Sequence, residues 1–440
     1  MKSLAKRARS KDVTMKRGYA CSSPEHNIAR REFLAGMAGG AGALASMAGL
    51  SGLATPAIAD QLTKQHKRVL VVFMSGGVSQ LETWDPKPKT NTGGPFRAIP
   101  TAVPGTHISE LLPKTAQHMD KLSLIRSINT KNGDHGKGRY QMVHGRNQRV
   151  GDDIPHLGSV CAKALEIPSN PLPGHIKIPT SGGSDAAYLG PRFASIGANG
   201  SPPNNSARPS SITVEIDQQR NEFRRKTNDR FAQRRRSAET DIYANSYEQA
   251  IELMKRREVF DLTKEPEKDH DRYGKFDLGK HCLLARRLLE HEVPYVQVSH
   301  SNYDTHNENF NFHLEQLGEF DLSFSTLIQD LHDRGMLEST LVVVMSEFGR
   351  TPTINARYGR DHWGTAWSIC LGGAKVQPGA VIGKTNANGT AVSEREVDHG
   401  HLFHTYLAAV GLDSTNAFNI GGREYPMADP SRSAISELIT

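Results

Sequence analysis

The chain has 440 residues, and its formal net charge is +7. That length allows a large buried core, in one elaborate domain or two. Most of the positive charge lies in residues 1–59, which carry nine Lys and Arg against three Asp and Glu, a net of +6. Residues 60–440 therefore keep only +1 (7 − 6). The basic composition thus gives no support for nucleic-acid binding.

The N-terminal segment has the layout of a twin-arginine export signal. Arg30 and Arg31 follow a basic stretch and precede a weakly apolar, Gly- and Ala-rich run, which closes with Ala-Ile-Ala at 57–59, an A-x-A-like cleavage site. We expect residues 1–59 to be a signal peptide and the protein to fold before export. It would then be periplasmic or secreted and would meet the membrane only in transit. Whether the leader is cleaved or kept as an anchor stays open.

Residues 60–440 are expected to form one domain outside the membrane. No later run of about 18 apolar residues follows the leader, so no membrane span is predicted there. The cysteines that remain, Cys161, Cys282 and Cys370, are odd in number and have no C-x-x-C spacing. A disulfide framework is therefore not expected.

Strand and helix patterns alternate along this part of the chain. The run 68–74 is continuous, apolar and β-branched, as in strands buried on both faces of a parallel sheet. Further strands are expected at 122–125, 293–299, 340–345 and 368–371, and helices at 217–260, 279–292, 312–335 and 401–410. The alternation predicts an α/β fold with a doubly wound, mostly parallel sheet and helices on both faces.

Two regions have further expected features. Residues 168–260 are predicted to be an insertion, with Gly-, Pro-, Ser- and Asn-rich loops up to 209 and then very basic helices. Their basic face is either an ordinary solvated surface or a cationic lid over an anionic substrate. In the helix 312–335, the apolar residues expected to face inward are Leu314, Leu317, Phe320, Leu327, Ile328 and Leu331.

Ligands in open α/β sheets bind beyond the carboxyl ends of strands, so the polar residues that follow the predicted strands are the site candidates. In chain order these candidates are His135, Arg139, Asp304, His306, Glu347, Arg350 and His362. Mixed carboxylate and imidazole ligands suit zinc, manganese or magnesium better than a thiolate-binding metal. The sequence therefore predicts an oxygen- and nitrogen-ligated metal site at this edge of the sheet.

Each candidate is given a role. We expect one divalent cation (zinc, manganese, magnesium or calcium) to be held by Asp304, His306, Glu347 and His362. Arg139 and Arg350 would bind an oxyanion. His135 would act as ligand, base or nucleophile, on the same face as Arg139 of a helix that starts near Asp134.

Each candidate also has a structural explanation. Asp304 and His306 could belong to a turn cap, and Glu347 could pair with Arg350 or Arg360. Residues 361–363 could be a packed loop anchor, and His135 an ordinary loop histidine. Because all of these candidates follow the ends of predicted strands, a common functional site is favoured over separate structural explanations for each residue.

Three segments resemble a known family. They are Met-Ser-Gly-Gly-Val-Ser-Gln-Leu-Glu-Thr-Trp-Asp-Pro-Lys-Pro at 74–88, the pair of segments 282–290 and 303–306, and Leu-Val-Val-Val-Met-Ser-Glu-Phe-Gly-Arg-Thr-Pro at 341–352 with Gly-Arg-Asp-His-Trp at 359–363. On these motifs the chain resembles a secreted member of domain-of-unknown-function family 1501 (DUF1501), over nearly all of residues 66–440. That family is similar in fold to alkaline phosphatases and sulfatases, which implies a core of that type.

The resemblance also implies roles for particular residues. Asp304 and His306 match a metal-binding pair, Glu347 an acidic ligand, and His135 the nucleophile position, with Arg139 on the arginine that follows it. Ser75 and Gly76 stand where sulfatases have metal-binding aspartates, and Phe348 stands where they have a histidine. The Ser, Cys or Thr nucleophile is missing.

Two functions are consistent with this pattern. One is metal-assisted hydrolysis of an anionic ester, a sulfate or phosphate ester of a small molecule or a glycan. The alternative is a non-catalytic binding or structural protein that kept the sulfatase-like fold. The sequence gives neither the substrate nor the oligomeric state.

Replacing both Arg30 and Arg31 by Lys should leave folded protein in the cytoplasm, because the twin-arginine pair is the targeting signal. Cell fractionation of the wild type and of the double variant measures this directly. Normal arrival of the double variant in the periplasm would contradict the targeting prediction.

Overall fold

The computed structural model describes residues 66–440 except 152, 168–169, 181, 184, 204–205, 236–237 and 421–422. The expected signal peptide thus lies outside the described residues. In the described part of the chain, no helix is both long and apolar enough to cross a bilayer. Cys161, Cys282 and Cys370 are buried and carry free thiols.

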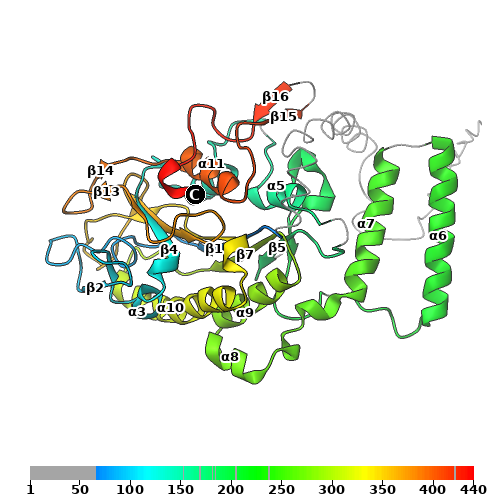
Figure 1. The fold of residues 1–440 in the computed structure, drawn as a ribbon, viewed down its shortest axis with the longest axis horizontal. Helices are drawn as coiled ribbons and strands as arrows, with labels where there is room; N and C mark the ends of the chain where they lie inside the picture. The colour runs from blue at the N-terminus through cyan, green and yellow to red at the C-terminus, as the bar shows by residue number, and fades with distance from the viewer. Residues whose placement is uncertain are drawn as a thin grey trace, which may run out of the picture.

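An eight-stranded sheet lies at the centre, in the order β12-β4-β11-β8-β1-β7-β5-β6 (Figure 1). Its strands are β1 (Arg68–Met74), β4 (Leu122–Ile128), β5 (His175–Ile178), β6 (Ile196–Gly197), β7 (Tyr295–His300), β8 (Thr340–Met345), β11 (Trp367–Gly372) and β12 (Val381–Ile382). Neighbouring strands are parallel except at β11, which runs antiparallel to β4 and β8. The predicted α/β class and mostly parallel sheet are confirmed.

The direction of β11 follows from the segment before it. After β8 the chain stays at the carboxyl edge of the sheet as the loop 346–366 and re-enters the sheet from that edge as β11. The loop contains the short antiparallel pair β9 (Gly349–Arg350) and β10 (His362–Trp363). The other two-stranded antiparallel sheets are β2 (Ala98–Pro100) with β3 (His107–Ser109), β13 (Lys384–Thr385) with β14 (Val392–Glu394), and β15 (Ala417–Ile420) with β16 (Arg423–Pro426).

Helices cover both faces of the central sheet. In Figure 1, α5 (Leu157–Ala164) and α11 (His399–Ala409) lie above it, while α9 (Asp277–Glu290) and α10 (Asn309–Asp333) lie below. The remaining helices packed around the sheet are α3 (Pro113–Ala116), α4 (His135–His144) and α8 (Glu267–Tyr273).

The apolar run of strand β1 is continuous because both of its faces are packed in hydrophobic cores. Leu70, Val72 and Met74 belong to the core on the α9 and α10 side. Val69, Val71 and Phe73 belong to the core on the side of α4, α5 and α11. Because successive side chains of a strand point to opposite faces, both faces of β1 must be apolar.

Two expectations about individual elements were wrong. The region 168–209 was expected to be loops, but it supplies β5 and β6 at one edge of the sheet. These strands have four and two residues, too short for a periodic signal beside so many Pro and Gly residues. Leu314 was expected to face inward, but it is 57% exposed. It lies about 90° around the helix from the middle of the buried arc that contains Leu317 and Phe320.

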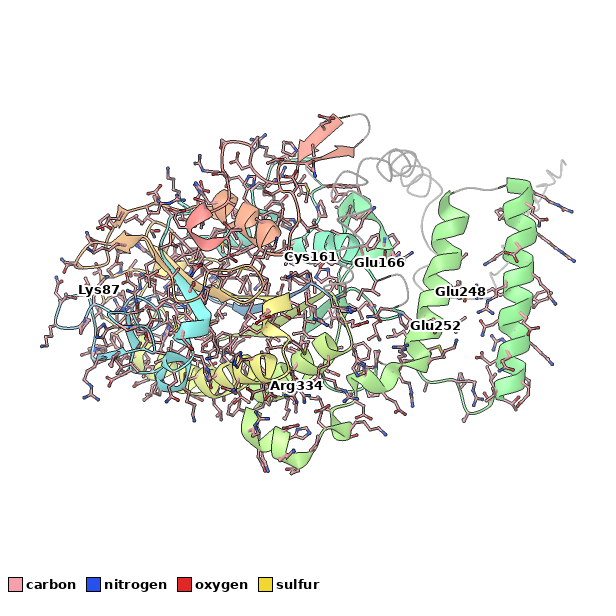
Figure 2. All side chains as sticks on the ribbon, in the orientation of Figure 1. Lys87, Cys161, Glu166, Glu248, Glu252 and Arg334 are labelled. Atoms are coloured by element: carbon pink, nitrogen blue, oxygen red, sulfur yellow. The ribbon has the colours of Figure 1, made fainter. Side chains whose placement is uncertain are left out.

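The predicted basic helices form a projecting arm. Figure 1 shows α6 (Val214–Arg235) and α7 (Ala238–Lys255) side by side at one end of the molecule. Glu248 of α7, labelled in Figure 2, accepts hydrogen bonds from Arg224 and Arg225 of α6. No described side chain of α6 is buried. The exposure of α6 agrees with an ordinary solvated surface. The cationic lid would need contacts between the arm and the predicted site residues, and none is found within the described part of the chain.

A buried ion pair ties together the segments at the carboxyl edge of the sheet. Glu82 and Arg360 have fully buried side chains and pair through two contacts, Nε to Oε2 at 3.1 Å and Nη2 to Oε1 at 2.8 Å. Asn309, at the start of α10, also donates to Glu82 Oε2. Burial alone would raise the pKa of Glu82, but the charge and hydrogen bonds of Arg360, together with the nearby His313 and Ser79, outweigh burial and lower it. The pair joins the segment after β1, the loop 346–366 and α10.

Candidate metal and anion site

The predicted site residues come together at the carboxyl edge of the sheet. Parallel strands β1, β7 and β8 end there side by side, since Met74 pairs with His300 and Phe73 with Met345. The loop after β7 carries Asp304 and His306, and the loop after β8 carries Glu347 and, through β10, His362. Helix α4 brings His135 and Arg139 to the same edge.

Two imidazoles and one carboxylate converge on a single point. The Nε2 atoms of His306 and His362 lie 3.0 Å apart. Each of them lies 3.1 Å from the same oxygen, Oδ1 of Asp304. In a tetrahedral zinc site with bonds of about 2.0–2.2 Å, ligand atoms lie about 3.3 Å apart. The three atoms are thus close to the spacing of three ligands on one cation.

The outer nitrogens of these imidazoles fix their protonation pattern. His306 Nδ1 lies 2.7 Å from Asp361 Oδ1, and His362 Nδ1 lies 2.7 Å from the carbonyl oxygen of Gly133. A carbonyl and a carboxylate only accept, so both Nδ1 atoms carry the proton. In the neutral imidazoles, both Nε2 lone pairs then face each other and Asp304 with no proton between them. Such a donor set fits a cation, and the Nδ1 partners are those that orient metal-binding histidines.

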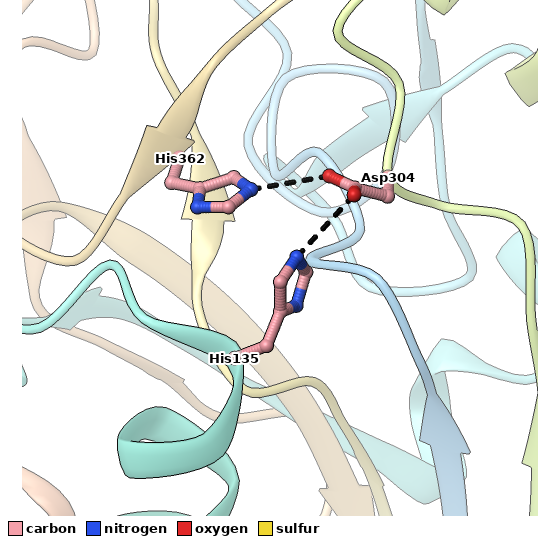
Figure 3. Close-up of side chains that lie close together, drawn as sticks. All are labelled: His135, Asp304 and His362. Atoms are coloured by element: carbon pink, nitrogen blue, oxygen red, sulfur yellow. Dashed lines mark hydrogen bonds and ion pairs between the residues drawn. The ribbon is translucent and has the colours of Figure 1, made fainter.

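His135 joins this cluster from α4. Figure 3 shows His135 and His362 each directed at a different oxygen of Asp304, with His135 Nε2 3.4 Å from Asp304 Oδ2. One ligand atom from each of these three residues lies within 4.8 Å of the others, which could hold a metal ion. Helix α4 begins at His135 as predicted, because the Asp134 side chain caps it by accepting from the Lys137 backbone N–H. Asp304 and His362 are therefore shared by two overlapping sets of ligands.

Glu347 lies behind His135. Its Oε1 is 2.8 Å from His135 Nδ1 and accepts from the Gly76 backbone N–H at 3.0 Å. Ser346 Oγ lies 3.0 Å from Oε2, and the Glu347 side chain is almost completely buried. A carboxylate in this place holds the proton on His135 Nδ1 and turns Nε2 toward Asp304. Its direct binding to a metal stays a prediction.

Arg350 lies behind Asp304, with its guanidinium turned mainly toward protein groups. Its side chain is fully buried, with Nε donating to the Gly77 carbonyl and Nη1 to the Arg360 carbonyl. Nη2 donates to Asp304 Oδ1 at 2.6 Å and also to the Gly76 carbonyl. Four of its five N–H groups are thus used by protein acceptors, so Arg350 positions Asp304, and its contact with an anion stays a prediction.

The charge state of Asp304 follows from these contacts. Burial alone would raise the pKa of Asp304, but the hydrogen bond and positive charge of Arg350, together with the imidazole neighbours, outweigh burial and lower the pKa to about 2. Asp304 is therefore an anion at any pH near neutrality. It can accept from Arg350 and ligate a cation at the same time.

A cleft of about 500 Å³ opens beside the cluster and is lined by Ser75, His135, Arg139, Asp304 and Glu347, among others. Arg139 Nη2 donates to Ser75 Oγ at 2.8 Å, and its guanidinium lies 4.7 Å from the centre of the Phe73 ring. The Arg139 side chain is exposed, unlike that of Arg350. His135 and Arg139 face the same cleft, as their spacing on a helix predicted.

Two glycines permit this crowding. Gly76 has φ of +115°, and a Cβ there would lie 2.5 Å from the Asp304 backbone nitrogen. A Cβ on Gly138 would lie 2.7 Å from the Glu347 carbonyl oxygen. The first lets the turn after β1 reach the Asp304 loop, and the second lets α4 approach the end of β8.

Some contributors to the site were missed by sequence reasoning. Asp361 was grouped with a packed loop anchor, although its place beside His362 in the Arg-Asp-His-Trp motif was the available signal. The Gly133 carbonyl had no sequence signal. Phe348 packs against His135 and His362, with ring centres 4.9 and 4.5 Å away, so it forms one wall of the cluster.

Comparison with known proteins gives one family and several solved structures. The model of the family described as "Protein of unknown function (DUF1501)" matches residues 66–439. No curated protein matches the sequence. The chain is similar to Ps i-CgsB, with 12% identity, 79% of this chain and 72% of that chain covered, and a TM-score of 0.40.

Two further structures show a similar level of likeness. The lipoteichoic acid synthase LtaP from Listeria monocytogenes has 8% identity over 81% of this chain and 75% of that chain, with a TM-score of 0.37. The C-terminal periplasmic domain of EcEptC from Escherichia coli, in complex with Zn, has 11% identity over 85% and 92%, with a TM-score of 0.37. At TM-scores below 0.5 these matches carry no weight for the chemistry of the site.

Replacing Asp361 by Asn should weaken divalent metal binding by about 10–100-fold, because the outer carboxylate fixes the tautomer and raises the basicity of His306. The exposed Asp413, replaced by Asn, is the matched control. Metal titration of the folded protein measures both variants. Unchanged affinity in the Asp361 variant would show that the charge of Asp361 does not support metal binding by His306.

Proposed function

The chain belongs to the DUF1501 family across residues 66–439, and we propose that it is a metal-assisted hydrolase of anionic sulfate or phosphate esters. One divalent cation would be held by Asp304, His306 and His362, with His135 next to them. The supporting observation is the convergence of two Nε2 atoms and one Asp304 oxygen within 3.0–3.1 Å, with both Nδ1 protons engaged elsewhere.

The residues present fit such a group. Imidazole nitrogen and carboxylate oxygen are ligands of zinc and manganese, and the outer contacts to Asp361 and Gly133 orient both imidazoles. A cation bound there would polarise an ester oxygen and lower the pKa of bound water, which removes the need for a serine or cysteine nucleophile.

Arg139 is suited to bind and orient the anion. It is the exposed guanidinium of the cleft, and its contact with Ser75 leaves N–H groups for a planar, bidentate contact with sulfate or phosphate oxygens. Phe73, beneath the guanidinium, holds its plane in place. The ester would thus lie between Arg139 and the Asp304 cluster.

His135 is suited to accept or deliver a proton. Because Glu347 holds the proton on Nδ1, the Nε2 lone pair faces the cleft side of Asp304. From that position it can take a proton from an attacking water and return it to the leaving oxygen. The same lone pair could instead ligate the cation, and the two roles differ in whether replacing His135 removes the metal or only the turnover.

A second function is a protein that binds anionic esters without hydrolysing them. It is favoured by the position of Arg350, whose buried guanidinium supplies no second cation to stabilise charge in the cleft. Turnover of p-nitrophenyl sulfate or p-nitrophenyl phosphate by metal-loaded protein supports the hydrolase. Binding of inorganic sulfate or phosphate with no turnover supports the binding protein. Export through the twin-arginine route, inferred from the leader, would place either activity outside the cytoplasm.

Purified protein should hold about one tightly bound divalent cation per chain, and His306→Ala should lose it, because the ligand set would fall to His362 and a carboxylate. His332→Ala, an exposed histidine near the end of α10, is the matched control and should keep the cation. Elemental analysis of protein folded with its native leader gives the answer. A wild-type protein without bound metal would contradict the predicted metal site.

Replacing Arg139 by Ala should weaken sulfate or phosphate binding by about 1.5–3 kcal/mol, the usual worth of a hydrogen bond to a charged group. Isothermal titration calorimetry with inorganic sulfate and phosphate measures the change. Arg220→Ala, on the exposed surface of α6, is the matched control. Equal affinities in the wild type and the Arg139 variant would show that Arg139 does not bind the anion.

A further inference from the structure

A second cavity adjoins the cleft and takes no part in the chemistry described so far. It has a volume of about 410 Å³ and shares Gly136 and Arg139 with the cleft as lining residues. We call this second cavity the groove. An ester held by Arg139 would have the groove directly beside it.

The floor of the groove is a polar stripe on an otherwise apolar sheet. Along β7, Val296 and Val298 belong to the core on the α9 and α10 side. The alternating residues Gln297 and Ser299 instead point to the opposite face and line the groove. Phe73 of β1, which pairs with Ser299, lines the groove as well.

Strand β5 continues the pattern. Ile176 and Ile178 belong to the same apolar core as the β7 valines. Lys177 points to the other face, lines the groove, and pairs in register with Gln297. Polar side chains on an inner strand of a covered sheet cost free energy unless they find partners. Their alignment on neighbouring strands places several polar groups side by side on one wall of the groove, where a bound ligand would meet them together.

Some of these groups have hydrogen-bonding capacity to spare. Gln297 Oε1 accepts from Tyr295 at 3.3 Å, but its amide N–H groups have no acceptor among the described residues. The Ser299 hydroxyl has no partner among them either. Lys177 pairs with Asp185, whose other oxygen accepts from the Ser195 backbone N–H at 2.9 Å. The floor thus offers an amide, a hydroxyl and an ion pair.

The wall of the groove adds imidazoles and an aromatic ring. Tyr140 and His144 of α4 stack with ring centres 4.1 Å apart and both line the groove. His156 Nδ1 accepts from the Gly158 backbone N–H at 2.9 Å, so its proton sits on Nε2. Burial lowers the pKa of His156 well below its usual value, so it is a neutral donor.

These groups describe the chemistry of the ligand. Amide, hydroxyl and neutral imidazole groups match hydroxyls that both donate and accept, and an aromatic ring gives an apolar face beside them. The lining mixes these polar groups with the apolar side chains of Phe73 and Val143, and its volume is that of a small-molecule site. We propose that the groove binds the leaving group of the ester and that this group is a sugar unit. This rests on the proposed function, since it assigns the alcohol side of the same substrate.

The test compares sugar esters with their inorganic anions. Dissociation constants are measured by isothermal titration calorimetry for the sulfate and phosphate monoesters of glucose, galactose and N-acetylglucosamine, and for inorganic sulfate and phosphate. The metal-loaded full-length protein should bind at least one sugar ester about tenfold or more tightly than the matching anion. Gln297→Leu should remove most of that difference, because it deletes the unpaired amide at similar size.

Two variants keep the test decisive. Gln218→Leu, exposed on α6, is the matched control and should keep the full difference. Ser299→Ala is a smaller change in the same floor and serves if the Gln297 variant does not fold. The proposal is overturned if no sugar ester binds more tightly than its anion, or if the folded groove variants keep the full difference.

The experiments distinguish failure of the sugar-binding proposal for the groove from failure of the proposed hydrolase function. Turnover of p-nitrophenyl esters without any preference for sugar esters would overturn the groove and leave the hydrolase standing. A sugar preference that Gln297→Leu removes, with no turnover of any ester, would support the groove in a protein that only binds.

Discussion

The Asp304 carboxylate is the contact on which the arrangement of the site depends. A single oxygen of this side chain lies 2.6 Å from Arg350 Nη2 and 3.1 Å from the Nε2 atoms of both His306 and His362. Arg350 is fully buried and keeps its charge, so it needs an anion at this place. Because buried Arg350 needs a carboxylate beside it, it holds Asp304 Oδ1 in place, and this is the oxygen that a metal would share.

A second buried ion pair, Glu82 with Arg360, stabilises the loops around Asp304. Glu82 and Arg360 have no exposure to water, and Arg360 also donates to the carbonyls of Thr92, Thr351 and Pro352. Removing one partner of such a pair typically costs about 3–5 kcal/mol, because the other charge is left buried alone. The arginine that precedes Asp361 and His362 thus anchors the segment on which they are presented.

The position of His135 distinguishes this site from one built on a hydroxyl nucleophile. The start of α4 carries an imidazole, and the buried carboxylate of Glu347 orients it. A carboxylate–imidazole pair beside a cluster of metal ligands suits proton transfer to or from water. The polar floor of the groove extends the same edge of the sheet toward β5, where a substrate would place the rest of its structure.

The sequence by itself determined the α/β class, the positions of β1 and β8, and the edge at which His135, Asp304 and His362 meet. These follow from local rules, since a continuous apolar run marks a doubly buried strand and parallel strands expose their carboxyl ends at one edge. The leader was read from the sequence alone and lies outside the described residues.

The tertiary structure decided which predicted residues face the cleft. Arg139 and Arg350 look alike in sequence, yet one is exposed and the other is buried against Asp304 and backbone carbonyls. The antiparallel course of β11, the support of His135 by Glu347 and the Gly133 carbonyl behind His362 were also decided there. Each depends on contacts between segments far apart in the chain, and spacing along a sequence does not encode which partners a folded chain brings within hydrogen-bonding distance.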